Sequence, residues 1–129
     1  MVEEQKNIEA GDVELVVEES KRIEEGKHVG KIVDITYRDW PFQYIDFHIE
    51  LPEKQVVLKV GYPAKITPDS SLGKLLKRLE LELKIGEKIT LSTLKKKLLG
   101  KDVSFLTQNK ETDLGTFARI VPSSLKKVD

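Results

Sequence analysis

Two stretches of alternating apolar and polar residues, joined by a short loop, dominate the chain between residues 29 and 51. The apolar positions of the first stretch fall on one side of a pleat: Val29, Val33, Ile35 and Tyr37. Those of the second stretch do the same: Ile45, Phe47, Ile49 and Leu51. A period of two over this length predicts half-buried antiparallel strands. The loop between them, residues 39–43, holds the single Trp of the chain.

A third strand and a helix are predicted after this hairpin. A turn at residues 52–54 leads into alternating apolar positions: Val56, Leu58, Val60 and Tyr62. Pro63 and Pro68 bound a loop, because proline cannot continue a ladder within a sheet. Residues 69–71 offer N-cap chemistry for a helix. Its apolar positions then follow at helical spacing: Leu72, Leu75, Leu76 and Leu79.

The rest of the chain predicts a short second helix and two more strands. We expect Ser92 to cap this helix and Gly100 to end it. A fourth strand then carries alternating Val103, Phe105 and Thr107, and a polar turn follows at residues 109–113. The fifth strand has Phe117, Arg119 and Val121 in one phase and ends at Pro122.

The predicted order is strand, strand, strand, helix, strand, strand, with an extra short helix before the fourth strand. This is the order of an OB-fold, a five-stranded Greek-key β-barrel with a helix between its third and fourth strands. We therefore predict an all-β barrel of this kind over residues 27–125. The same order also suits another α+β sheet. Barrel closure would show as the first strand pairing with both the second and the fourth.

Length and composition fit one globular domain. The chain of 129 residues is 39% hydrophobic and 34% charged, and its lack of cysteine excludes disulfides and thiolate chemistry. No apolar run approaches the roughly 18 residues that would span a bilayer. The N-terminus also lacks the pattern of a signal peptide, so a cytoplasmic protein is expected. Abundant Lys and Glu with few Asn and Gln fit a thermophilic source.

Charge is distributed unevenly, although 22 basic and 22 acidic residues cancel overall. Residues 1–26 hold nine acidic and three basic residues, which leaves 13 acidic and 19 basic residues in the remainder. An acidic arm joined to a basic body suggests a polyanionic partner, although Lys and Glu also simply keep a surface solvated. We expect the first ten or so residues of the arm to be disordered. Residues 13–15 could form a short added strand, and residues 18–25 a helical turn ending at Gly26.

Aromatic and basic residues around the first loop suggest a binding surface for single strands. OB-folds bind along their second and third strands, with the loops after strands one and four closing over the ligand. A basic groove with aromatic faces for base stacking is the usual arrangement for single-stranded nucleic acid. The candidate stacking residues are Trp40, Phe42 and Tyr44. The candidate phosphate-binding residues are Arg38, Lys59, Lys65, Lys110 and Arg119.

Each ring also has a structural interpretation. Trp40 and Phe42 are expected on the surface, because rings at a turn have little core to enter, but they could fold back as a hydrophobic plug. Tyr44 could serve packing alone. Four other rings lie in phase with apolar neighbours and are expected in the core: Tyr37, Tyr62, Phe105 and Phe117. The lysines of the two helices are expected to form a solvated face.

Catalytic and metal-binding signatures are not found in the sequence. There is no Gly-rich phosphate loop, nucleophile elbow or H-E-x-x-H pattern. Ser70, Ser71 and Ser92 are explained as helix caps. His28 and His48 lack partners at metal-ligand spacing, and only the alternating Asp46, His48 and Glu50 offer a weak cation-binding pattern. We therefore expect a protein that is not an enzyme and that needs no metal or cofactor.

Several stretches resemble a known group of proteins. They are residues 25–33 (EGKHVGKIV), 71–76 (SLGKLL), 100–105 (GKDVSF) and 115–120 (GTFARI). These stretches are similar to small OB-fold proteins of bacteriophages and archaea that bind single-stranded DNA. The resemblance spans about residues 25–125 and consists of glycines and apolar positions, so it implies the fold more than the activity. The acidic arm departs from the pattern.

The sequence thus favours a non-catalytic, weakly sequence-specific single-stranded DNA-binding protein that acts in replication or recombination. Its affinity is expected to fall steeply with salt, because phosphate contacts release counterions. Nothing in the residues separates DNA from RNA. The alternative is an OB-fold that serves as a protein-interaction or oligomerisation module, which the zero net charge favours. In that case Trp40 and Phe42 would anchor a protein partner or a second copy of the chain.

Overall fold

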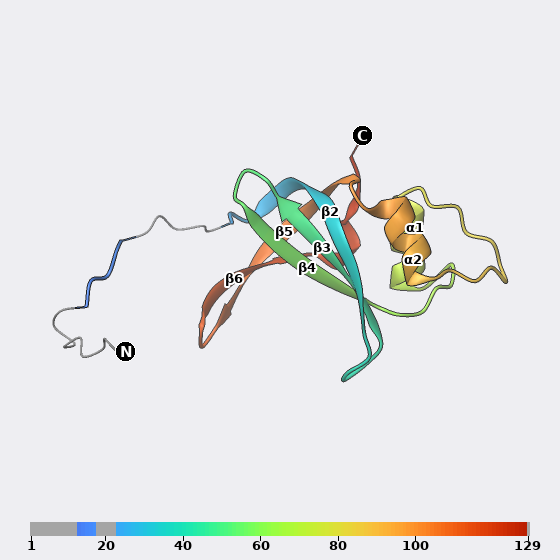
Figure 1. Ribbon diagram of the computed structural model, residues 1–129, viewed down its shortest axis with the longest axis horizontal. Helices are drawn as coiled ribbons and strands as arrows, with labels where there is room; N and C mark the ends of the chain where they lie inside the picture. The colour runs from blue at the N-terminus through green and yellow to red at the C-terminus, as the bar shows by residue number, and fades with distance from the viewer. Residues whose placement is uncertain (1–12, 18–22, 129) are drawn as a thin grey trace, which may run out of the picture.

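The computed structural model of the chain describes residues 13–17 and 23–128 (Figure 1). The described residues form a mostly β fold, a six-stranded antiparallel sheet with two helices. In chain order the elements are β2 (Gly26–Arg38), β3 (Tyr44–Leu51), β4 (Val56–Pro63), α1 (Ser71–Arg78), α2 (Leu91–Leu98), β5 (Asp102–Thr112), β6 (Gly115–Ile120), the 3-10 helix η2 (Pro122–Ser124) and β7 (Lys126–Lys127). The expectations for residues 1–12 and 18–22 lie outside the described residues.

The sheet has the strand order β4-β3-β2-β5-β6, and the short β7, which the sequence does not predict, pairs with β5. The first long strand, β2, pairs with both β3 and β5, which is the pairing given above as a sign of barrel closure. The sheet is nevertheless open, because no ladder joins β4 to β6 among the described strands. The all-β prediction is confirmed at this level, and the closed barrel is not observed.

Because of a β-bulge in β2, the predicted inward face of the first strand is wrong at Val29 and Val33 and correct at Ile35. Ile32 pairs with Ile49 and Asp34 pairs with His48, so Val33 is an extra residue in the ladder. An extra residue shifts the side-chain alternation by one position. The buried side chains are therefore Ile32 and Ile35, whereas Val29 and Val33 are exposed. Tyr37 shares the face of Ile35 but lies near the end of the strand, where it is also exposed rather than in the core.

The β5–β6 hairpin is longer than predicted. Residues 109–112 continue β5 instead of forming a turn, and the ladder runs out to the pair Thr112–Gly115. The turn is therefore tighter, with Asp113 and Leu114 at its tip. This register places Ile120 in the core opposite Thr107. It turns Phe117 outward, where it is 53% exposed, so the assignment of Phe117 to the core is wrong.

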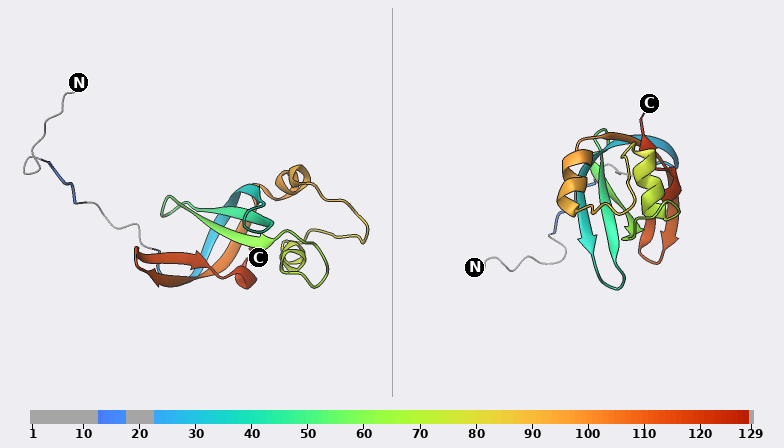
Figure 2. Two further views of the ribbon diagram at one scale, coloured as in Figure 1. Left: turned by 90° about the horizontal axis from the view of Figure 1, so that it is seen from below. Right: turned by 90° about the vertical axis from the view of Figure 1, so that its right-hand side faces the viewer.

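Two short helices lie beyond one end of the sheet (Figures 1 and 2). The Ser70 side chain caps α1 by accepting a hydrogen bond from the Gly73 N–H, as predicted for residues 69–71. Thr90, and not Ser92, caps α2 by accepting from the Thr93 N–H. Leucines of both helices enter the core, namely Leu72, Leu75, Leu76, Leu79, Leu94 and Leu98. Within the described residues, no helix is long and apolar enough to cross a membrane.

The core lies between the sheet and the helices. The alternating residues predicted for β3 are all buried: Ile45, Phe47, Ile49 and Leu51. Tyr62 and Phe105 are also buried, as expected. Ile23 joins this core although it precedes β2. Residues 13–17 form no strand, and Val13, Leu15, Val16 and Val17 are exposed, so the short added strand is not present.

Candidate nucleic-acid interface

The tip of the β2–β3 hairpin carries two exposed aromatic rings. Trp40 is 79% exposed and Phe42 is 70% exposed. They lie between Arg38, the last residue of β2, and Tyr44, the first residue of β3. Because the hairpin projects past the body of the sheet (Figure 1), core residues do not cover its tip. The predicted exposure of both rings is confirmed.

Below this tip, the outer face of β2, β3 and β4 is organised in cross-strand rows of mainly polar residues. These residues alternate with the buried Ile45, Phe47 and Ile49 of β3, and therefore point away from the core. From the tip downward, the rows are Arg38–Tyr44–Pro63, Thr36–Asp46–Gly61, Asp34–His48–Lys59 and Lys31–Glu50–Val57. Side chains in neighbouring rows are close enough to interact diagonally.

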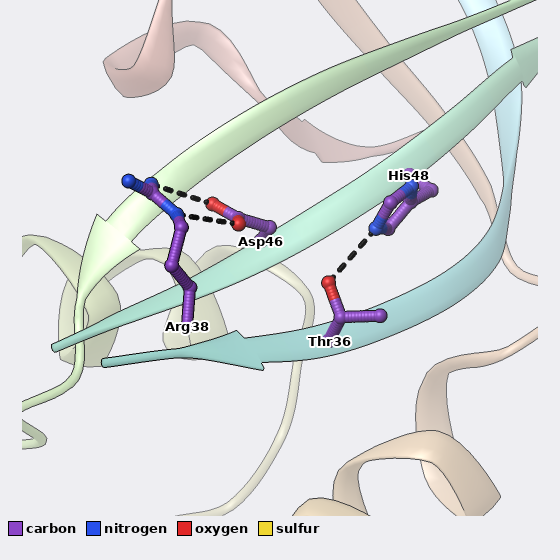
Figure 3. Close-up of polar contacts among 4 residues, drawn as sticks. All are labelled: Thr36, Arg38, Asp46 and His48. Carbon is purple, nitrogen blue, oxygen red and sulfur yellow. Dashed lines mark hydrogen bonds and ion pairs between the residues drawn. The ribbon is translucent and has the colours of Figure 1, made fainter. Parts of the chain in front are cut away.

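Arg38 and Asp46 form such a diagonal pair across the first two rows (Figure 3). Arg38 Nε donates to Asp46 Oδ2 over 3.0 Å, and Arg38 Nη2 donates to Asp46 Oδ1 over 3.1 Å. Asp46 is only 3% exposed, so its carboxylate is almost entirely desolvated beneath the guanidinium. These hydrogen bonds, together with the Asp46 charge, raise the pKa of Arg38 above its ordinary value. The Arg38 guanidinium also lies over the Tyr44 ring, 4.7 Å from its centroid.

Gly61 provides the space for this pair. A Cβ atom at Gly61 would lie 2.5 Å from Asp46 Oδ1 and 3.2 Å from Arg38 Nη2. It would also lie 3.1 Å from Cδ2 of Tyr44. Glycine in the middle of a strand often marks the close approach of another group. Here that group is the carboxylate of the neighbouring strand, so Gly61, Asp46, Arg38 and Tyr44 form one packed unit.

The lower rows are also occupied by internal contacts. His48 Nε2 and Thr36 Oγ1 share a hydrogen bond of 2.9 Å (Figure 3). Asp34 accepts a hydrogen bond from the Ile35 N–H, which is the main reason that the pKa of Asp34 is lowered. Lys95 Nζ also lies 3.5 Å from Asp34 Oδ1. Asp46 and His48 thus turn toward different partners on β2. No cluster of three potential metal ligands is found in the part of the chain that the structure describes.

The remaining predicted cations are spread over the molecule. Lys59 lies in the third row on β4, and Lys65 is exposed in the loop after β4. Lys110 and Arg119 do not join these rows, because they lie on the outer face of the β5–β6 hairpin, beside the exposed Phe117. The tips of the two hairpins project on the same side of the body (Figures 1 and 2). The structure therefore brings together Arg38, Trp40, Phe42 and Tyr44, with Lys59 and Lys65 on the neighbouring strand and loop.

The outer face of β2–β4 is balanced in charge rather than basic. Its cations are Lys31, Arg38 and Lys59, and its carboxylates are Asp34, Asp46 and Glu50. Lys31 is also 3.6 Å from Asp102 on β5. The candidate phosphate-binding residues therefore do not form a basic groove on this face. Aromatic surface and directional hydrogen bonding are its more distinctive features.

Sequence reasoning missed the roles of Asp46 and Gly61 on this surface, and the exposure of Phe117 on the β5–β6 hairpin. A signal existed for the first two. A hairpin centred on residues 39–43 places Asp46 diagonal to Arg38, and a lone glycine within a predicted strand indicates close approach. Phe117 could not be found, because its direction depends on the register of the β5–β6 turn.

Comparison with known proteins assigns the chain to no family. No protein-family model matches the chain, and no curated protein matches it. The resemblance to single-stranded DNA-binding proteins stays a prediction. Function is therefore argued from the geometry of the hairpin tip and the outer face.

Proposed function

We propose that the protein binds single-stranded nucleic acid, without catalysis, along the outer face of β2–β4 and the β2–β3 hairpin tip. The observation that carries the proposal is the pair of exposed rings, Trp40 and Phe42, beside the Arg38–Tyr44 stack. Each base stacked on an aromatic side chain contributes roughly 1 to 3 kcal/mol with little dependence on sequence. Two or three stacked bases would therefore give useful affinity. We expect DNA to be the ligand, and RNA of the same sequence should be tested beside it.

An OB-type arrangement of the sheet supports this proposal. The pairing of β2 with both β3 and β5, and the helices between β4 and β5, agree with the order of an OB-fold. The Tyr62 hydroxyl on β4 donates a 2.7 Å hydrogen bond to the Pro122 carbonyl, just after β6, so the two edges of the open sheet are linked. In OB-folds the ligand lies on the face formed by the second and third strands, which correspond to β3 and β4.

Phosphate contacts on this surface would come from Lys59 and Lys65, and a strand that extends to the β5–β6 hairpin would add Lys110 and Arg119. Arg38 is unlike them, because its charge is already offset by Asp46. For single strands, the logarithm of the binding constant falls with the logarithm of salt concentration by about 0.7 for each neutralised phosphate. We therefore expect a slope of about −3 or shallower, with appreciable stacking-driven binding left at high salt.

The test is a titration with unlabelled oligonucleotides that follows the fluorescence of Trp40, the single Trp of the chain. Saturable quenching is expected, stronger at low salt than at high salt. Anisotropy of a labelled oligonucleotide then compares the double variant Trp40→Ala/Phe42→Ala with Ile85→Ala. Ile85 is also largely exposed but lies in the loop between the helices, so it controls for the loss of apolar surface.

We expect the double variant to weaken binding by at least tenfold, because about 1 to 3 kcal/mol is lost for each stacked base. The Ile85 variant should bind like the original chain. Absence of quenching at low salt, or equal binding by both variants, would refute the proposal.

A protein-interaction module is the second candidate. The balanced charge of the outer face favours it, as do exposed apolar residues on the other half of the sheet: Val29, Leu106 and Phe117. In that case the hairpin tip would insert into a pocket of a partner, as aromatic anchors do at interfaces. An oligonucleotide titration without fluorescence change, together with a concentration-dependent molecular mass in solution, would support self-association through the hairpin tip and the exposed apolar residues.

A further inference from the structure

One arginine on the outer face is held in a fixed orientation. Arg38 makes two hydrogen bonds to Asp46, and its guanidinium lies on the Tyr44 ring. Asp46 is buried and lies against Gly61, so neighbouring atoms restrict the movement of its carboxylate. The flexible side chain of an exposed arginine normally loses considerable entropy when it binds a ligand. At Arg38 this ordering is already present in the folded chain.

The free edge of this guanidinium carries two parallel donors. Nε and Nη2 share the edge that faces Asp46, whereas Nη1 and the second N–H of Nη2 form the adjacent edge at the end of the side chain. Nη1 makes no hydrogen bond to any residue within 13–17 and 23–128, and the Arg38 side chain is 41% exposed. The second edge is therefore available to a planar group that offers two neighbouring acceptors.

The chemistry of this edge favours a base over a phosphate. Asp46 already offsets the Arg38 charge, which reduces its attraction for a phosphate anion but keeps its N–H groups in position. Guanine presents the acceptor pair O6 and N7 on one edge, and arginine binds this pair bidentately. Adenine has a donor in place of O6. Cytosine offers two acceptors on its pairing edge, but guanine adds a larger surface to stack beside Trp40 and Phe42.

We propose that Arg38 recognises a guanine base within a bound single strand, and that Asp46 and Tyr44 are its positioning residues. This inference rests on the proposed function and adds a base preference at one position of an otherwise sequence-tolerant site. The other bases stack on the rings of the hairpin tip, and the lysines of β4 and its following loop contact the phosphates.

The first experiment compares labelled single strands of about 15 nucleotides, a length near the upper end of the site sizes of single-strand-binding OB-folds. One strand is all dT, and the others carry dG, dA or dC at every third position. Anisotropy at one fixed salt concentration gives the affinities of the full chain. We expect the dG strand to bind on the order of tenfold more tightly than the dT strand, with dA and dC close to dT.

The second experiment uses matched variants. Arg38→Lys keeps the charge but removes the planar pair of donors, so the dG preference is lost while dT binding changes by less than about threefold. Asp46→Asn and Glu50→Gln each remove one carboxylate from the outer face of β3. By charge alone both would strengthen binding to every strand. We expect this for Glu50→Gln, whereas Asp46→Asn loses the dG preference because Arg38 is released.

The outcomes separate the inference from the proposed function. Equal affinity of the original chain for all four strands overturns the guanine contact but leaves single-strand binding standing. An equal loss of affinity of Arg38→Lys for all strands also overturns it, because that result indicates a phosphate contact. No binding to any strand overturns both proposals. Thermal melting monitors folding, and if Asp46→Asn does not fold, the Arg38→Lys comparison decides.

Discussion

At the residue scale, the outer face is organised by a carboxylate that the fold has removed from water. Burying a charge is costly unless it is paired and hydrogen-bonded. Asp46 meets this condition through the two donors of Arg38. Removing Arg38 leaves a buried charge without its partner, whereas lysine at this position keeps a cation in reach. Arg38→Lys is therefore a better test of the pair than Arg38→Ala, because it keeps a cation near Asp46.

Gly61→Ala is expected to destabilise the fold and disturb the pair. The added Cβ would meet Asp46 Oδ1 at 2.5 Å, which is closer than real Cβ contacts, so the carboxylate must move. Overpacking of this kind costs typically about 1 to 3 kcal/mol. Urea denaturation followed by circular dichroism measures the loss, and oligonucleotide anisotropy should show weaker dG preference in the same variant.

A double-mutant cycle tests whether Asp46 is the reason for this cost. In an Asp46→Ala background the Cβ added at position 61 no longer meets the carboxylate, so Gly61→Ala should cost less than in the original chain. An equal cost in both backgrounds would indicate that the clash with Asp46 is not its cause.

Exposure of single rings can be predicted where local geometry decides it. The prediction is correct for Trp40 and Phe42 because a hairpin tip offers no core on either side. It is wrong for Tyr37 and Phe117, since their phase along a strand says nothing about where the core ends or how the next turn is built. The sequence identifies Asp46 as an outer polar residue, but its burial depends on Arg38 and Gly61 from two other strands.

At the element scale, the second helix shows how two candidate caps compete. Thr90 and Ser92 both have suitable hydroxyls, and the prediction from sequence names Ser92 alone. In the structure Ser92 lies inside α2, whereas Thr90 has extended backbone and its Oγ1 accepts from the Thr93 N–H over 3.1 Å. Capping needs the non-helical conformation of the residue as well as its side chain.

Thr90→Ala is therefore expected to lower the free energy of unfolding by about 1 kcal/mol, the usual cost of losing an N-cap. Ser92→Ala is the matched control, since it removes a hydroxyl two residues away and should change stability by less than about 0.5 kcal/mol. Urea denaturation at neutral pH measures both. A larger effect of the Ser92 variant would contradict the assignment of the cap.

The bulge in β2 is the second lesson at this scale. Before the bulge the even-numbered Ile32 is buried, and after it the odd-numbered Ile35 is buried, because Val33 is an extra residue in the ladder. The two halves of the strand therefore bury side chains of opposite parity. The strand is predicted correctly as an element, because its apolar content is high throughout. Its buried side is predicted correctly only after the bulge, at Ile35, because a bulge depends on the partner strand as much as on local sequence.

At the scale of the whole molecule, Tyr62 links the two edges of the open sheet. Its hydroxyl donates to the Pro122 carbonyl, and Arg78 of α1 donates to the same oxygen over 3.2 Å and to the Leu125 carbonyl over 2.8 Å. The segment after β6 is therefore fixed against β4 and α1. Burial raises the pKa of Tyr62 from 10.0 to about 12.

This shift makes stability dependent on alkaline pH. Below pH 10 the Tyr62 proton is bound in both states, and between pH 10 and 12 the unfolded chain loses it first. Unfolding is thus favoured as pH rises, by roughly 3 kcal/mol at most for a shift of about two units. Tyr62→Phe should cost about 1 kcal/mol at pH 8 through the lost hydrogen bond, and this difference should shrink or reverse toward pH 12. Urea denaturation across this range measures it, and a constant difference would contradict the shift.

The arm can be tested by truncation at two positions. Residues 1–22 carry seven acidic and three basic residues, so their removal should strengthen binding to a polyanion and leave the urea midpoint unchanged. Removal of residues 1–26 also deletes Ile23, which is buried in the core, and should lower stability by about 1.5 to 3 kcal/mol. Anisotropy and denaturation measure the two effects. Unchanged affinity after the shorter truncation would dismiss a role of the arm in binding.

The sequence by itself determined the strands, the helical interlude and the exposed hairpin tip of this protein. Each of these depends on periodicity, helix caps and turn residues that act over a few positions. Only the tertiary structure decided which face of β2 and β6 is buried, that the sheet stays open, and that Asp46 lies beneath Arg38 against Gly61. Those features depend on register between strands far apart in the chain, where a shift of one residue reverses every side chain.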